Sequence, residues 1–146
     1  DQITSRKELP NGKLDPKLKE AFEKAWELSN SDDPSSRREI GGYIGLEADG
    51  TIGVRMWEPG NSNRIIAPKL DKTKMYMGLR VTGEFHTHPN PPPSYQNFSP
   101  DVGGIKGDVS VILSQGYSGL SFVISRNYIA TLDSIGSQRM YRRDRM

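Results

Sequence analysis

The chain has 146 residues, no cysteine and two histidines. This length suits one domain that buries its own core, and the lack of cysteine excludes disulfides, thiolate nucleophiles and cysteine-ligated metal sites. Any transition-metal site must therefore use His86, His88 and carboxylates, and a Ser-His-Asp triad would need one of the same two histidines. No apolar run approaches the roughly 20 residues of a membrane-spanning helix, so we expect no membrane partner.

The formal net charge of +2 is concentrated at the C-terminus. Residues 139–146 carry four Arg and one Asp, or +3, which leaves −1 for the rest of the chain. We interpret this segment as a basic tail that adds solubility, and not as a nucleic-acid site. Residues 1–14 are polar and have the composition of a leader or linker, so the folded domain is expected over 15–138. The start at Asp1, without a secretory signal, predicts a domain cut from a longer protein.

The first predicted element is an amphipathic helix over residues 16–30. Asp15 can cap it and Pro16 suits its first position, and apolar residues then recur at approximately helical spacing. Strands are predicted at 39–46 and 51–58, where an Asp-Gly turn joins two apolar stretches. These two strands should form a hairpin.

The second half of the chain is predicted to combine strands with one helix. The expected elements are a short strand at 63–68, strands at 79–88, 120–125 and 128–133, and a helix at 108–115. Residues 89–107 are rich in Pro and Gly and form a long loop, which in a compact domain is typically functional or disordered. The whole order predicts an α/β (α+β) fold with a mixed, mostly antiparallel sheet flanked by helices.

The most informative stretch is Gly-Glu-Phe-His-Thr-His-Pro at residues 83–89. His86 and His88 share one face of the predicted strand, about 6.5 Å apart along the chain, so both imidazoles can bind one metal ion. A catalytic zinc with two His ligands needs a third protein ligand and an open position for water. Without cysteine the third ligand is Asp or Glu, and Asp101 and Asp108 in the following loop are the candidates. Hydrolysis also needs a base close to the water.

Together these residues resemble the JAMM (MPN+) zinc metallopeptidase family. The family pattern is an upstream Glu, then His-Ser/Thr-His-Pro, then Ser-x-x-Asp. Here Glu39 begins Glu-Ile-Gly-Gly-Tyr-Ile-Gly, His86-Thr87-His88-Pro89 follows, and Ser99 precedes the acidic residues of the loop. The resemblance covers roughly residues 15 to 133. The helix, a Ser-rich turn, Arg-Glu-x-Gly-Gly and His-Thr-His-Pro further resemble JAMM-like domains at the C-termini of bacterial polymorphic (Rhs-type) toxins.

The resemblance implies a JAMM/MPN-like (cytidine-deaminase-like) fold, bound Zn²⁺ and a peptidase or isopeptidase activity. His86 and His88 would be zinc ligands, Glu39 the general acid and base, and Ser99 a hydrogen-bond donor to the oxyanion. The substrate would be a protein or peptide, cut at a lysine isopeptide, as in ubiquitin-like deconjugation, or at a linear peptide bond. The likeness to toxin domains implies an effector that acts in the cytoplasm of a target cell, with a cognate immunity protein as partner.

The sequence departs from the family pattern after Ser99, because Asp101 gives Ser-x-Asp and Val102 stands where the family has Asp. Asp101 follows a Ser-Pro pair that favours a helix start. Asp108 begins a better helix and stands at the family's distance from the next strand, so we favour Asp108 as the ligand and keep Asp101 as the alternative. With Asp108 as the ligand, the role of Ser99 is open. Glu84 shares strand parity with the histidines and competes with Glu39 as the base, although we expect it at a solvated rim position.

Two other functions remain alternatives. The irregular Ser-Asp spacing is compatible with a non-catalytic JAMM-like interaction module that has lost its metal. The His pair combined with the basic tail is compatible with a metal-dependent nuclease, which should bind nucleic acid in a salt-sensitive way. We favour the peptidase over both.

Overall fold

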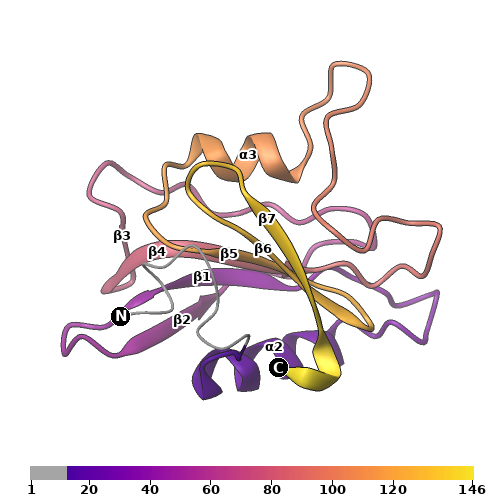
Figure 1. Ribbon diagram of the computed structural model, residues 1–146, viewed down its shortest axis with the longest axis horizontal. Helices are drawn as coiled ribbons and strands as arrows, with labels where there is room; N and C mark the ends of the chain where they lie inside the picture. The colour runs from indigo at the N-terminus through magenta and orange to yellow at the C-terminus, as the bar shows by residue number, and fades with distance from the viewer. Residues whose placement is uncertain (1–12) are drawn as a thin grey trace.

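Residues 13–146 are described by the computed structural model of the chain, so residues 1–12 of the predicted leader lie outside the described residues. The described part is a small α+β domain with two α-helices and one open, mixed, mostly antiparallel sheet of seven strands (Figure 1). Its elements are α2 (Pro16–Leu28), β1 (Gly41–Leu46), β2 (Ile52–Met56), β3 (Met75–Tyr76), β4 (Leu79–Thr87), α3 (Asp108–Ser114), β5 (Ser121–Ile124), β6 (Tyr128–Leu132), β7 (Gln138–Arg142) and a 3-10 turn, η2 (Arg143–Arg145). The sequence therefore predicted the α+β class correctly.

Helix α2 begins as its sequence predicts. Asp15 accepts a hydrogen bond from the backbone N of Lys17 at 2.9 Å, and Pro16 occupies the first helical position, which together stabilise the start of the helix. Leu18, Phe22 and Ala25 are buried because their spacing places them on one face of the helix. This face packs against the sheet.

Strand β4 lies at the centre of the sheet, whose order is β2-β1-β4-β5-β6-β7, with β3 paired to the start of β4. It pairs with β1 in antiparallel and with β5 in parallel fashion. The parallel pair forces the chain to cross from one end of the sheet to the other between β4 and β5. Residues 88–120, which include the Pro- and Gly-rich loop and α3, make this crossover, so the loop starts beside the carboxyl end of β4.

A β-bulge in β4 decides which side chains face which helix. The register between β1 and β4 shifts at Ile44 and Gly45, which leaves Thr82 as an extra residue in β4. One extra residue reverses the alternation of side chains. As a result Val81 packs in the core beneath α3, whereas Phe85 packs in the core beneath α2.

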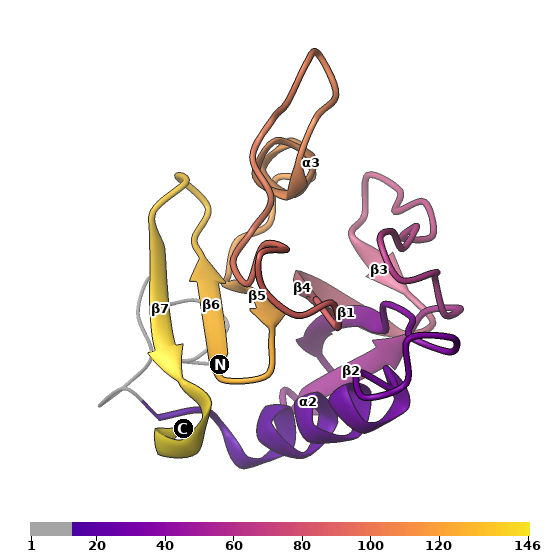
Figure 2. The same ribbon diagram turned by 90° about the vertical axis from the view of Figure 1, so that its right-hand side faces the viewer.

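The two helices cover opposite faces of the sheet, α2 on one side and α3 on the other (Figure 2). The core on the α2 face includes Leu18, Phe22, Ala25, Ile44, Phe85 and Phe122. The core on the α3 face includes Tyr43, Trp57, Leu79, Val81, Ile112 and Val123. In the described range neither α-helix combines the length and the apolar composition needed to cross a membrane.

The C-terminal segment 139–146 is part of the fold and not the separate tail that its charge suggested. β7 pairs with β6 over five residue pairs and forms an edge of the sheet. The guanidinium of Arg143 lies 5.1 Å from the ring centroid of Trp26 and donates to the carbonyls of Ser125 and Arg126. Charged side chains are common on edge strands because they discourage pairing with other chains. The strand expected at 63–68 is not formed, and these residues are irregular.

Candidate metal centre

Strands β1 and β4 bring Glu39 and His86 together. Gly41 pairs with His86, and a Cβ at Gly41 would lie 2.6 Å from the carbonyl oxygen of Phe85 and 3.1 Å from the Cβ of His86. Glycine is needed here because the two backbones approach so closely. Glu39 lies two residues before Gly41, on the same face, and its backbone N donates to the carbonyl of Asn61 at 2.7 Å. Its side chain is thereby fixed beside the histidine and is buried.

His88 follows β4 directly and continues its direction, since its backbone N donates to the carbonyl of Ile124 at 2.8 Å. Its Nδ1 lies 3.0 Å from the carbonyl oxygen of Tyr95. A carbonyl only accepts hydrogen bonds, so Nδ1 is the donor in this contact, and Nε2 is the ring nitrogen that faces Asp108 and is left for a metal ion. A hydrogen bond from the other ring nitrogen to a backbone carbonyl is the usual way in which a metal-binding histidine is oriented.

Three candidate ligand atoms converge at one point. The Nε2 atoms of His86 and His88 are 3.1 Å apart, and Oδ2 of Asp108 lies 3.3 Å from the first and 3.1 Å from the second. Zinc binds nitrogen and oxygen at about 2.0 to 2.1 Å, so two ligand atoms at the corners of a tetrahedron are about 3.3 to 3.4 Å apart. The observed distances are close to these values. The two imidazoles and the carboxylate therefore have the spacing of ligands around one metal ion.

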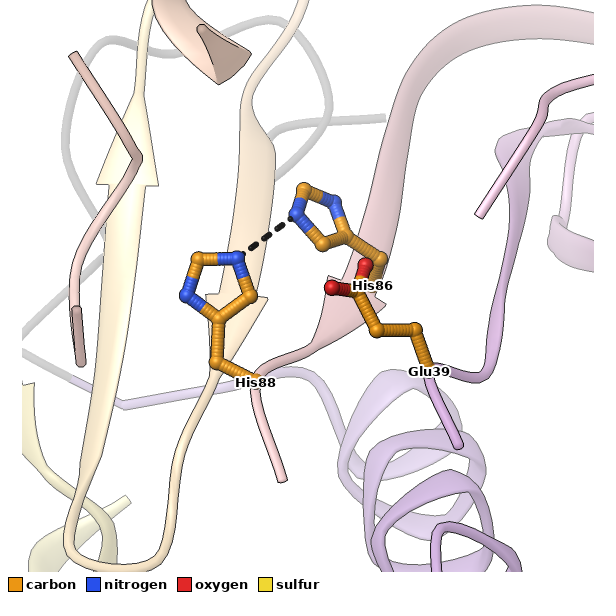
Figure 3. A group of neighbouring side chains, drawn as sticks. All are labelled: Glu39, His86 and His88. Carbon is orange, nitrogen blue, oxygen red and sulfur yellow. Dashed lines mark hydrogen bonds between the residues drawn. The ribbon is translucent and has the colours of Figure 1, made fainter. Parts of the chain in front are cut away.

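Glu39 adds a second carboxylate to this point. Its carboxylate and the two imidazoles form a buried group whose ligand atoms all lie within 4.8 Å of one another, close enough to bind a metal ion. Figure 3 shows the carboxylate of Glu39 turned toward the pair of rings. The site thus has two carboxylates. That of Asp108 contacts both histidines, and that of Glu39 lies beside them.

Ser99 holds Asp108 in place, although the two are nine positions apart in the sequence. The backbone N of Ser99 donates to Oδ2 of Asp108 at 2.9 Å, and the backbone N of Asp108 donates to Oγ of Ser99 at 3.0 Å. Between them the chain makes a short excursion in which Val102 and Ile105 bridge around a turn of two glycines with positive φ. The excursion brings the chain back to Ser99. Serine and aspartate therefore lie side by side despite the irregular Ser-Asp spacing that was compatible with a lost metal site.

Asp101, the alternative ligand, faces a different way. It is exposed, and its carboxylate accepts hydrogen bonds from the backbone N of Gly107 and the hydroxyl of Ser110. These bonds satisfy groups at the start of α3, where the helix leaves backbone N–H groups without internal partners. The structure therefore brings Asp108 to the histidines and uses Asp101 to stabilise the helix terminus.

Glu84 is buried and does not occupy the solvated rim position that we expected. It lies on the face of β4 that carries His86, is 5% exposed, and accepts a hydrogen bond from the hydroxyl of Tyr117 at 2.8 Å. Burial raises the pKa of Glu84, against the opposing effects of His86 and Tyr117. Tyr117 supplies the partner that allows a carboxyl group to be buried here.

The two carboxylates next to the histidines have opposite pKa shifts. Burial raises the pKa of Glu39 to about 7, with the charge of His86 opposing the rise and that of Asp108 adding to it. Burial also acts to raise the pKa of Asp108, but hydrogen bonds from His86 and His88 hold it well below its usual range. Burial acts to lower the pKa of His86, yet the hydrogen bond and charge of Asp108 raise it to about 9. Binding of a metal would displace that proton.

The site opens into a cleft of about 900 Å³, a size typical of ligand pockets. The irregular segment at residues 62–67 lines this cleft together with Trp57, Tyr95 and parts of α3. Glu39, His86, His88, Ser99 and Asp108 all contribute to its lining. A substrate in this cleft can therefore reach the candidate metal ligands.

The sequence indicated the two histidines and Glu39 but not two groups around them, the carbonyl of Tyr95 beside His88 and the hydroxyl of Tyr117 beside Glu84. The carbonyl of Tyr95 and the hydroxyl of Tyr117 have no sequence signal, because a backbone acceptor and a distant phenol are brought close only by the fold. Comparisons of the chain with protein-family models, with curated proteins and with solved structures find no match. The function must therefore be inferred from the chemistry of the site itself.

Proposed function

We propose that this chain is a zinc-dependent peptidase or isopeptidase with a JAMM/MPN-like fold. The observation that carries the proposal is the convergence of His86, His88 and Asp108 within 3.1 to 3.3 Å of one another, with Glu39 buried beside them. Two imidazoles and one carboxylate are a common ligand set of catalytic zinc sites, which keep a fourth position open. When bound, the zinc ion supplies Lewis acidity, which lowers the pKa of water toward about 7 and polarises an amide carbonyl.

Glu39 serves as the general base and then as the general acid. Burial raises its pKa to about 7 in the metal-free site, and a carboxylate in this position would accept a proton from the attacking water and, as a carboxylic acid, give that proton to the leaving amine nitrogen. Amide hydrolysis needs this transfer because an amine leaves readily only when it is protonated. The burial that raises the pKa of Glu39 is thus matched to the reaction.

Ser99 is the candidate hydrogen-bond donor to the substrate. Its Oγ accepts from the backbone N of Asp108, which leaves the hydroxyl hydrogen free for an acceptor in the cleft. A carbonyl oxygen that gains negative charge during attack is such an acceptor. Ser99 would therefore both hold Asp108 and stabilise the oxyanion.

The substrate that we propose is a protein or peptide, cut at a lysine isopeptide or at a linear peptide bond. The cleft at the site has the volume for a peptide segment. The role as a toxin effector that acts in the cytoplasm of a target cell, with a cognate immunity protein as its partner, depends on the sequence resemblance alone.

The experiment is metal removal and reconstitution of the purified chain. The protein is stripped with a chelator, reloaded with zinc and assayed against isopeptide-linked and linear peptide libraries, with product termini identified by mass spectrometry. We expect near-stoichiometric zinc and amide cleavage that chelation abolishes. Zinc binding without cleavage of either library would contradict the peptidase. Failure to bind zinc would refute the metal site and the enzyme, and would favour the non-catalytic interaction module that has lost its metal.

A further inference from the structure

We propose that Thr87, the residue between the two histidines, is a positioning residue that fixes Glu39 relative to the metal ligands. It acts through a buried chain of hydrogen bonds from Ile40 to the end of helix α2. The inference builds on the proposed function, since Glu39 is assigned as the base only there.

The first contacts are those between Thr87 and Ile40, the residue that follows Glu39. The backbone N of Ile40 donates to Oγ1 of Thr87 at 3.0 Å, and the backbone N of Thr87 donates to the carbonyl of Ile40 at 2.9 Å. Ile40 precedes the first residue of β1, so a side-chain hydroxyl takes the place of a backbone acceptor for its N–H. One threonine therefore holds both backbone polar groups of the residue next to the base.

The chain then continues to helix α2. Oγ of Ser29 donates to the carbonyl of Ala25 at 2.9 Å and lies 2.5 Å from Oγ1 of Thr87. A hydroxyl has one hydrogen, and Ser29 has used its own on Ala25, so Thr87 must be the donor in the bond between the two hydroxyls. The order is Ile40 N–H to Thr87, Thr87 to Ser29, and Ser29 to Ala25, with every donor satisfied.

Burial makes this chain rigid. The side chains of Thr87 and Ser29 are fully buried, and Ile40 is 3% exposed. Water cannot replace a lost partner easily at such a site, so an N–H left without an acceptor forces the backbone to move. Ile40 is the neighbour of Glu39 in the chain, and Thr87 is the neighbour of both histidines. If Ile40 moves away from Thr87, Glu39 therefore moves relative to His86 and His88. A misplacement of about 1 Å can lower the rate of an enzyme by on the order of 100-fold.

The test compares Thr87→Val with Thr87→Ser and with Thr82→Val. Valine keeps the shape of threonine but cannot accept from Ile40, whereas serine keeps the hydroxyl. Thr82 is a matched control, because it is a buried threonine of the same strand that does not line the cleft. We expect Thr87→Val to lower kcat of the zinc-loaded protein by about 10- to 100-fold while zinc affinity, measured by competition with a chelator, changes by less than about 10-fold. Thr87→Ser should restore kcat, and Thr82→Val should leave it unchanged.

Two results would overturn the inference: equal kcat in Thr87→Val and Thr82→Val, or a loss of kcat that serine does not restore. A second readout does not depend on enzyme activity. Thr87→Val should increase the hydrogen-exchange rates of the Glu39 and Ile40 amides, and Thr87→Ser should not. Unchanged exchange in Thr87→Val would refute the positioning role even if no substrate is found, whereas faster exchange without amide cleavage would refute only the proposed function. Should Thr87→Val fail to fold, Thr87→Ala gives the same comparison.

Discussion

The two sides of the candidate metal centre are built in different ways. On one side Glu39 and His86 are held by the pairing of β1 with β4 and by backbone hydrogen bonds, and both side chains are buried. On the other side Asp108 reaches the histidines from the crossover, where Ser99 is its hydrogen-bonded partner and residues 101–106 are exposed. The strand side (Glu39 and His86) is therefore positioned by the pairing of the sheet. The loop side (Ser99 and Asp108) is positioned by a few local hydrogen bonds.

This difference also separates the roles of the two carboxylates. Glu39 is buried among strands, and burial raises its pKa to about 7, which suits a group that takes up and releases a proton. The hydrogen bonds from the histidines hold the pKa of Asp108 well below its usual range, which suits a group that stays charged and binds a cation. The same chemical group thus serves two functions because its surroundings differ.

The strand side should show the largest effect on turnover. Glu39→Gln preserves the size of the side chain and one acceptor oxygen but cannot transfer the proton, so we expect kcat to fall by about 10²- to 10⁴-fold. Zinc content, measured by elemental analysis of the same sample, should not change. Full activity in this variant would show that Glu39 is not the base.

The loop side should show the largest effect on metal affinity. Asp108→Asn removes the charge of the proposed third ligand, and we expect zinc affinity to fall by on the order of 100-fold or more. Loss of a group that only hydrogen-bonds to a ligand already lowers metal affinity by about 10- to 100-fold. Asp101→Asn is the matched control, since its carboxylate only accepts hydrogen bonds at the start of α3. Competition with a chelator measures both. A larger loss in Asp101→Asn would reverse the ligand assignment.

The strand side was predictable from the sequence, and the loop side only in part. Alternation along a strand is a local rule, so it placed His86 and His88 correctly, and spacing to the next strand favoured Asp108. The contact between Ser99 and Asp108 was not predictable, because it depends on the path of the loop between them. No local sequence pattern indicates that this loop turns back at residues 102–105. Glu84 was misplaced for a similar reason, since only tertiary structure brings Tyr117 to it.

A smaller effect on metal affinity should follow from Ser99→Ala. This change removes the acceptor of the Asp108 backbone N–H but keeps the backbone bond from Ser99 to the carboxylate. We expect zinc affinity to fall by about tenfold, the lower end of the range for groups that orient a ligand. Ser110→Ala, which removes a hydroxyl bonded to Asp101 instead, should leave zinc affinity unchanged. If the two variants behave alike, the loop side does not depend on Ser99.

The smallest effect should come from Glu84→Gln, the change on the strand side that most resembles Glu39→Gln. Burial raises the pKa of Glu84, and the amide oxygen of glutamine can still accept from the hydroxyl of Tyr117. The substitution therefore keeps the hydrogen bond, and we expect it to change free energies by less than about 1 kcal/mol. We therefore expect kcat to change by less than about fivefold, measured beside Glu39→Gln in the same assay. A loss as large as that in Glu39→Gln would mean that the base cannot be assigned from burial and position, because both carboxyl groups would then take part in proton transfer.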